Sequence, residues 1–155
     1  MNISVVPFEE KHLKGIAEVE NRSFSTPWSE KSFSDELTNN VATYFVAISE
    51  DKVVGYIGFW TVADEADITN VAVLPEYRKS GIGSILLKET VSYCISEKLV
   101  SINLEVRESN SAAKNLYSKF GFIPIGLRKR YYSNPVEDAI IMSLSLNQER
   151  NTQNG

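Results

Sequence analysis

VAVLPEYRKSGIGS, residues 71–84, decides the fold: an apolar run, a proline, a basic pair and a Gly-x-Gly loop follow one another. The apolar residues predict a buried strand, which Pro75 ends. Helical spacing of apolar residues from Ile82 onward predicts a helix after the loop. Glycines let the backbone approach a ligand, and free N–H groups at a helix N-terminus attract anions. The loop is therefore predicted to bind phosphate, with a plain strand-to-helix turn as the alternative.

Two common nucleotide-binding loops do not fit this stretch. A Walker A loop needs a glycine, four residues and then Gly-Lys-Ser/Thr, and the chain contains no such run. A dinucleotide fingerprint needs a third glycine at the position where Leu86 stands. The loop thus suits an anion without matching either signature.

Strands and helices are predicted on both sides of the loop. Runs of β-branched and aromatic residues predict strands near 2–6, 41–48, 53–62, 66–74, 100–106, 122–131 and 136–146. Four helices are predicted: around Leu13, after the N-cap residue Ser29, from Ile82, and from Ala112 to a C-terminal cap at Gly121. Hairpins at both ends of this order indicate an α/β chain with a mixed sheet.

The length of the chain fits one domain. Its 155 residues contain no repeat and no linker, so we predict a single domain over 1–146. Residues 147–155 contain no apolar side chain, and this tail is predicted to be disordered.

Composition excludes several classes of protein. The net charge is −4, which argues against nucleic-acid binding. One Cys and one His cannot form a disulfide framework or a Cys/His zinc site, which favours a cytoplasmic protein without a metal. No apolar run predicts a membrane helix. Residues 1–74 have a net charge of −7 and residues 75–155 one of +3, so an anion is expected in the second half. His12, in a charged segment, is expected at the surface.

The loop also resembles the signature of a known family. Arg78–Gly83 is similar to the Arg/Gln-x-x-Gly-x-Gly/Ala sequence by which GCN5-related N-acetyltransferases (GNAT) bind acetyl-coenzyme A. LEVRESN, residues 104–110, resembles the RimI-type branch, which acetylates the N-terminal alanine of ribosomal proteins. Further similar segments, up to about Leu146, are 22–24, 27–29, 116–117, 121–122, 131–132 and 137–139.

This resemblance implies a fold and a co-substrate. The fold is a seven-stranded mixed sheet with splayed strands 4 and 5 and four flanking helices, and the co-substrate is acetyl-coenzyme A. Strand backbone and Asn110 would contact the pantetheine, and the loop would hold the pyrophosphate. The implied coenzyme-binding residues are Val71, Ala72, Val73, Arg78, Lys79, Ser80, Gly81, Ile82, Gly83, Ser84, Asn110 and Tyr117.

The resemblance also implies a catalytic mechanism and the residues that would perform it. Acetyl would pass directly to the acceptor amine in a ternary complex, with Glu105 as the base and Tyr117 as the acid. Cys94 falls on an apolar helix stripe with no His near it in sequence, so an acyl-enzyme is not expected. A solvent-facing Glu105 and a core Tyr117 are the structural alternatives.

The predicted acceptor is the N-terminal alanine of a small-subunit ribosomal protein, with a basic tail that the acidic first half would attract. Trp28, Tyr131 and Tyr132 would contact this peptide, and plain packing is the alternative for all three. Asn110 could equally be a helix cap. A lysine, a polyamine or another small amine as acceptor, and a non-catalytic acyl-coenzyme A binding module, remain open. The protein is expected to be a monomer or weak dimer that contacts neither nucleic acid nor membrane.

Overall fold

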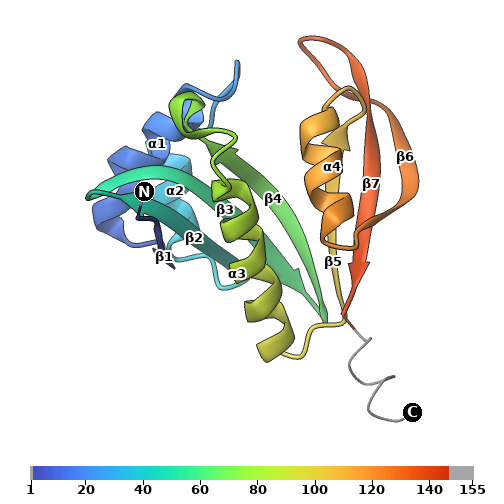
Figure 1. Cartoon of the computed structure of the whole chain (residues 1–155), viewed down its shortest axis with the longest axis horizontal. Helices are drawn as coiled ribbons and strands as arrows, with labels where there is room; N and C mark the ends of the chain where they lie inside the picture. The colour runs from blue at the N-terminus through green and yellow to red at the C-terminus, as the bar shows by residue number, and fades with distance from the viewer. Residues whose placement is uncertain (1, 147–155) are drawn as a thin grey trace. The chain divides into compact units, whose positions relative to one another are not determined.

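The computed structural model describes residues 2–146, and every predicted strand and helix is present in that range (Figure 1). The strands are β1 (Ser4–Pro7), β2 (Ala42–Ser49), β3 (Lys52–Val62), β4 (Glu65–Val73), β5 (Ser101–Arg107), β6 (Ile123–Tyr132) and β7 (Glu137–Ser145). The helices are α1 (Leu13–Asn21), α2 (Glu30–Glu36), α3 (Ile82–Ser96) and α4 (Ser111–Lys119), with short 3-10 turns at Glu10–His12 and Pro75–Tyr77. The predicted tail lies outside the described residues.

The strands form one seven-stranded sheet in the order β1-β2-β3-β4-β5-β7-β6. Antiparallel pairs join β1 to β2, β2 to β3, β5 to β7 and β6 to β7, whereas β4 and β5 are parallel. The α3 crossover makes the parallel pair possible, because parallel strands cannot be joined by a tight turn. The predicted mixed sheet is confirmed. Within the described residues, the parallel ladder joins only Glu65–Asp67 to Ser101–Asn103, at the beginning of both strands.

The chain divides into two compact units, and each is described by itself. The first runs to Thr61 and includes Thr69–Tyr93, so it holds β1–β3, the end of β4, α1, α2 and most of α3. The second combines Val62–Ile68 with the chain from Cys94 on, and holds the start of β4, β5–β7 and α4. The single domain over 1–146 remains a prediction.

In the first unit, helices cover both faces of the β2–β3 hairpin. Phe33 of α2 packs edge-on against Tyr44 and Tyr56, with ring centroids 6.2 and 5.5 Å apart. Tyr93 of α3 contacts Phe45 and Phe59, at 5.8 and 5.7 Å. Successive strand residues point to opposite faces of the sheet. Tyr44 therefore belongs to the aromatic cluster under α2, and Phe45 to the cluster under α3. The core of the unit therefore has two sides, one under α2 and one under α3.

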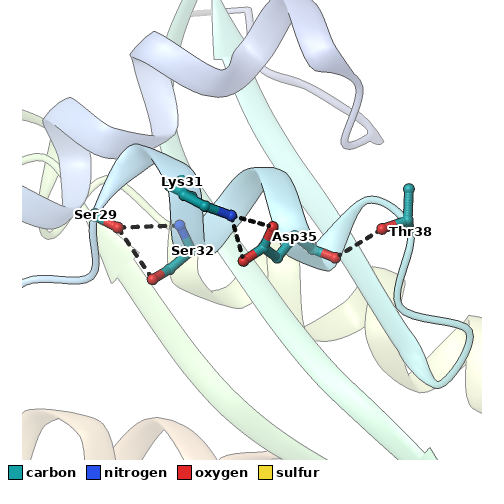
Figure 2. A network of polar contacts seen from close by, with 5 residues as sticks. All are labelled: Ser29, Lys31, Ser32, Asp35 and Thr38. Atoms are coloured by element: carbon teal, nitrogen blue, oxygen red, sulfur yellow. Dashed lines mark hydrogen bonds and ion pairs between the residues drawn. The ribbon is translucent and has the colours of Figure 1, made fainter.

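Helix α2 begins where the sequence predicts, at Ser29. The Ser29 Oγ accepts a hydrogen bond of 3.1 Å from the Ser32 backbone N–H, which satisfies one free donor of the first turn (Figure 2). Within the helix, Lys31 Nζ lies 3.1 Å from Asp35 Oδ1, and the Thr38 hydroxyl donates to the Asp35 carbonyl after the helix ends (Figure 2). All these contacts are local, so the position of this helix in the chain can be predicted from its own sequence, while Phe33 packs it onto the sheet.

His12 is not at the surface, contrary to the expectation from its charged neighbours. It is only 7% exposed, and its Nδ1 accepts a 2.9 Å hydrogen bond from the Glu9 backbone N–H. The ring closes a capping box at the start of the 3-10 turn and stacks with Phe8 at 6.4 Å. Burial lowers the pKa of His12. The charged residues around it are thus the exposed side of a turn whose His faces inward.

In the second unit, β5 alternates between a buried and an open face. Ile102, Leu104 and Val106 are buried, whereas the residues between them are partly exposed. The predicted C-terminal cap of α4 is present: Gly121 has a φ of +99°, and its N–H donates to the Ser118 carbonyl. Glu105 lies between two buried residues in sequence and so points to the face opposite the buried one.

Candidate functional site

The predicted anion loop lies in the first unit, between β4 and α3. Gly81 has a φ of +87°, a conformation that favours glycine, and a Cβ at this position would meet no atom within 4 Å. The Ser80 hydroxyl donates to the Tyr77 carbonyl, and the Gly81 carbonyl accepts from the Ile85 N–H in the first turn of α3. Two hydrogen bonds therefore hold the loop, and the N-terminus of α3 follows it directly, an arrangement suited to a phosphate group.

Arg78 is turned back toward the strand. Its Nε donates 2.9 Å to the Val73 carbonyl, and one Nη lies 3.3 Å from the Ser23 hydroxyl. Val73, Ala72 and Val71 form the end of β4, and the following Leu74 N–H bonds to the Val54 carbonyl. Arg78 thus ties the loop to the strand end, and its predicted contact with the coenzyme remains a prediction.

Trp28 packs into the first unit at the loop before α2. Its ring lies 5.4 Å from that of Phe33, and its backbone N–H donates 3.0 Å to Glu20 Oε2. Glu20 is 2% exposed and also accepts from the Tyr56 hydroxyl. The packing alternative holds for Trp28, and its contact with a peptide stays a prediction. Glu20 was not singled out in the sequence, although it stands four residues after the buried Ile16 on one helix face.

Glu105 forms an ion pair in the second unit. Its Oε2 accepts a 2.6 Å hydrogen bond from Arg128 Nε, and the two side chains are 28% and 55% exposed. The carboxylate is therefore partly shielded and paired on the open face of β5, and its role as the base remains a prediction. The sequence pattern does not identify Arg128 as the partner of Glu105, because the two residues are 23 positions apart.

Tyr131 and Tyr132 lie beside this carboxylate. Burial, followed by the charge of Glu105, raises the pKa of Tyr131. Burial also raises the pKa of Tyr132 to about 12, with Tyr131 and Glu105 adding to the effect. The two rings meet edge-on at 5.0 Å, and the Arg107 guanidinium sits 4.4 Å above the Tyr132 ring. The phenols near Glu105 are thus hydrogen-bond donors at neutral pH.

Tyr117 is a core residue of α4, as the packing alternative states. It is 5% exposed, lies 5.6 Å from Phe122, and burial raises its pKa to about 12, with Tyr132 as a second cause. Asn110 caps the same helix, because its Oδ1 accepts a 3.1 Å bond from the Ala113 N–H. A further side-chain bond could use the Nδ2 donor or the second acceptor site of Oδ1. Tyr117 and Asn110 therefore have structural roles that do not prevent the predicted ones.

Other chemistries find little support in the described residues. Cys94 is fully buried, and burial raises the pKa of its thiol to about 12, so a thiolate nucleophile at neutral pH is disfavoured. Among residues 2–146, no three His, Cys, Asp or Glu side chains are grouped so as to hold a metal ion. None of the helices in that range is long and apolar enough to span a membrane.

Comparisons with known proteins identify relatives over almost the whole chain. The acetyltransferase (GNAT) family matches residues 13–122. A Bacillus subtilis protein, provisionally named a [ribosomal protein bS18]-alanine N-acetyltransferase, is 42% identical over 86% of this chain and 89% of its own. The Escherichia coli [ribosomal protein bS18]-alanine N-acetyltransferase is 32% identical over 92% and 97%.

Solved structures agree with these sequence comparisons. The crystal structure of the Escherichia coli ribosomal-protein-S18-alanine N-acetyltransferase superposes with a TM-score of 0.87, covering 94% of both chains. A chain of the NatC complex bound to Gag peptide and CoA, 26% identical, superposes with a TM-score of 0.82 over 94% of this chain and 99% of its own. The seven-stranded fold with four helices is thus shared with both.

Proposed function

The chain belongs to the GNAT acetyltransferase family, and from this premise we propose that it acetylates the N-terminal alanine of a small-subunit ribosomal protein. The choice of acceptor is supported by the similarity, over most of both chains, to relatives that are named for this reaction on ribosomal protein bS18. Such an acceptor would be met in the cytoplasm. The proposed reaction is direct transfer from acetyl-coenzyme A.

The anion loop suits the coenzyme's pyrophosphate. The N-terminal N–H groups of α3 would donate hydrogen bonds to its oxygens, and the open space at Gly81 leaves room for them, with Lys79 two residues earlier as a positive charge in the loop. In our proposal the backbone of Val71–Val73 pairs with the pantetheine arm, and Asn110 adds a side-chain bond. An N–H near Val73 would meet the oxyanion of the tetrahedral intermediate, a kind of contact worth ~10²- to 10³-fold in rate.

Glu105 is the proposed base. A peptide α-amine has a pKa of about 7.7–8.0, so freeing it at pH 7 costs only ~1 kcal/mol, whereas a lysine near 10.4 costs ~5 kcal/mol. One carboxylate acting through a water molecule is enough for the first task. Glu105 faces away from the apolar side of β5, and Tyr131 and Tyr132 stand beside it to orient an incoming peptide.

Tyr117 is proposed to assist the leaving thiolate by a hydrogen bond. Its pKa of about 12 keeps the phenol protonated at neutral pH. Full transfer of that proton to a thiolate, whose thiol has a pKa near 8.5, would be uphill by ~5 kcal/mol. A hydrogen bond without complete transfer therefore fits the burial of this residue better.

Tyr117→Phe is expected to lower kcat by about 10- to 100-fold, because a hydrogen bond to a charged partner is lost. The KM for acetyl-coenzyme A should stay near the wild-type value. Steady-state release of free thiol measures both, and Tyr93→Phe, on α3, controls for loss of a phenol hydroxyl. A wild-type kcat in Tyr117→Phe would contradict the assigned role.

The acceptor is tested by mass spectrometry of a bS18 protein co-expressed with this chain. We expect a single acetyl group on the N-terminal alanine, and an unmodified N-terminus would contradict the proposal.

A library of N-terminal peptides then tests the breadth of peptide specificity, and a peptide KM that rises with salt is expected if the acceptor's tail is basic. A pH–rate profile that keeps rising well above pH 8 would favour a lysine or polyamine, and binding of acetyl-coenzyme A without thiol release would favour a binding module.

A further inference from the structure

The ion pair between Glu105 and Arg128 ties the proposed base to the edge strand of the sheet. Arg128 lies on β6, the last strand in the order, and Glu105 lies on β5, with β7 between them. The contact is a single bond of 2.6 Å from Nε to Oε2. It thus spans three strands and twenty-three residues of sequence, and it occupies an oxygen that the proposed mechanism needs.

The register of the strands explains how the two side chains meet. Glu105 is opposite Ile141 on β7, and Arg128 is opposite Ala139 two residues away. Paired residues and residues two apart share one face of a sheet, so both charged side chains rise on the same side. Ala139 is fully buried and small, so a long side chain can cross above it.

Arg107 shares this face but has a different role. It is opposite Ala139 from the other side, and it bonds to Glu137 at 3.2 Å and to the Ser133 and Pro135 carbonyls at 3.1 Å. Four contacts, counting the Tyr132 ring, fix Arg107 as a brace of the β6–β7 turn. Arg128 is held by Glu105 and a more distant ring, Tyr131 at 5.9 Å, and is 55% exposed. Arg128 can therefore swing away without loss of the turn.

We propose that Arg128 is a latch on Glu105, which pairs with the carboxylate when no acceptor is bound and is displaced by the acceptor's α-ammonium group. This inference rests on the proposed function, since it takes Glu105 as the group that receives the amine. A guanidinium and an ammonium carry the same charge and compete for the same oxygen. An exposed ion pair is worth only ~0.2–1 kcal/mol, so the latch is weak enough for a substrate to open. Arg128 is thus a positioning residue that acts through Glu105.

The test compares the kinetics of Arg128→Gln with those of the wild type on an acceptor peptide that begins with alanine. The KM for the peptide is expected to fall by about two- to fivefold, because the competing cation is gone. The KM for acetyl-coenzyme A should not change. Arg128→Lys keeps a cation and is expected to keep the wild-type KM. Lys129→Gln removes the same charge from the same strand without touching Glu105, and it controls for general electrostatic attraction.

Two results would overturn the latch. A peptide KM in Arg128→Gln that equals or exceeds the wild-type value would mean that Arg128 does not compete, and an equal fall in Lys129→Gln would reduce the effect to net charge. Failure of the proposed function gives a different result: the wild type itself would leave the peptide unacetylated while still binding acetyl-coenzyme A, and the latch would fall with it. A wild type that acetylates the peptide therefore separates the two questions.

Discussion

Glu105→Gln is expected to lower kcat by about 10²- to 10⁴-fold, the range that general bases contribute. Gln keeps the size of the side chain and can still accept the hydrogen bond from Arg128 Nε, so the fold of the second unit should be kept. The loss should shrink as the pH rises from 7 to 9, because a growing share of the peptide α-amine is already unprotonated. Thiol release at saturating peptide, measured across that pH range, tests both statements.

The matched control for this substitution is Glu108→Gln. Glu108 follows β5 directly and is exposed, and its change removes the same charge three residues from Glu105. It should leave kcat unchanged. If Glu105→Gln also retains the wild-type kcat, the base lies elsewhere and the proposed mechanism is wrong, whereas an equal loss in both variants would indicate an effect of net charge.

Gly58→Ala is expected to destabilise the protein by about 3 kcal/mol. Gly58 on β3 is opposite Tyr44 on β2, and a Cβ there would lie 2.2 Å from Cε2 of that ring. The ring cannot move aside freely, because its hydroxyl donates 2.8 Å to the buried Glu36 and its face packs near Phe33 and Tyr56. Moving it would leave a buried carboxylate short of a donor. Urea unfolding of the purified variant measures the loss.

Gly126→Ala is the control for this second change. A Cβ on Gly126 would lie 3.3 Å from Cδ1 of Ile141, the far end of a flexible side chain that can shift. Its cost should stay below about 1 kcal/mol. If Gly58→Ala unfolds at the same urea concentration as the wild type, the contact between β3 and Tyr44 is not the tight one described above.

The sequence by itself determined the local elements and the family. Ser29 caps α2 through a residue three positions away, Gly121 ends α4 through the turn before it, and Gly81 opens the anion loop by its own backbone angles. Each of these depends on interactions within a few residues, which a single sequence contains. The motif at residues 78–83 and the LEVRESN segment likewise indicated the GNAT family, which the relatives confirm.

Only the tertiary structure decided the partners of the charged side chains. Arg128 meets Glu105 because both strands pair with β7, in registers that place the two side chains on the same face. The pairing of β6 with β7 also shifts between Arg128 and Tyr132. Glu20 is buried and accepts a hydrogen bond from the Tyr56 hydroxyl, a partner that is 36 residues away in sequence. A long-range pair depends on strand order and register, where a shift of one residue would turn a side chain to the other face. The residues next to each charged side chain in sequence do not indicate which strand order and register the sheet adopts.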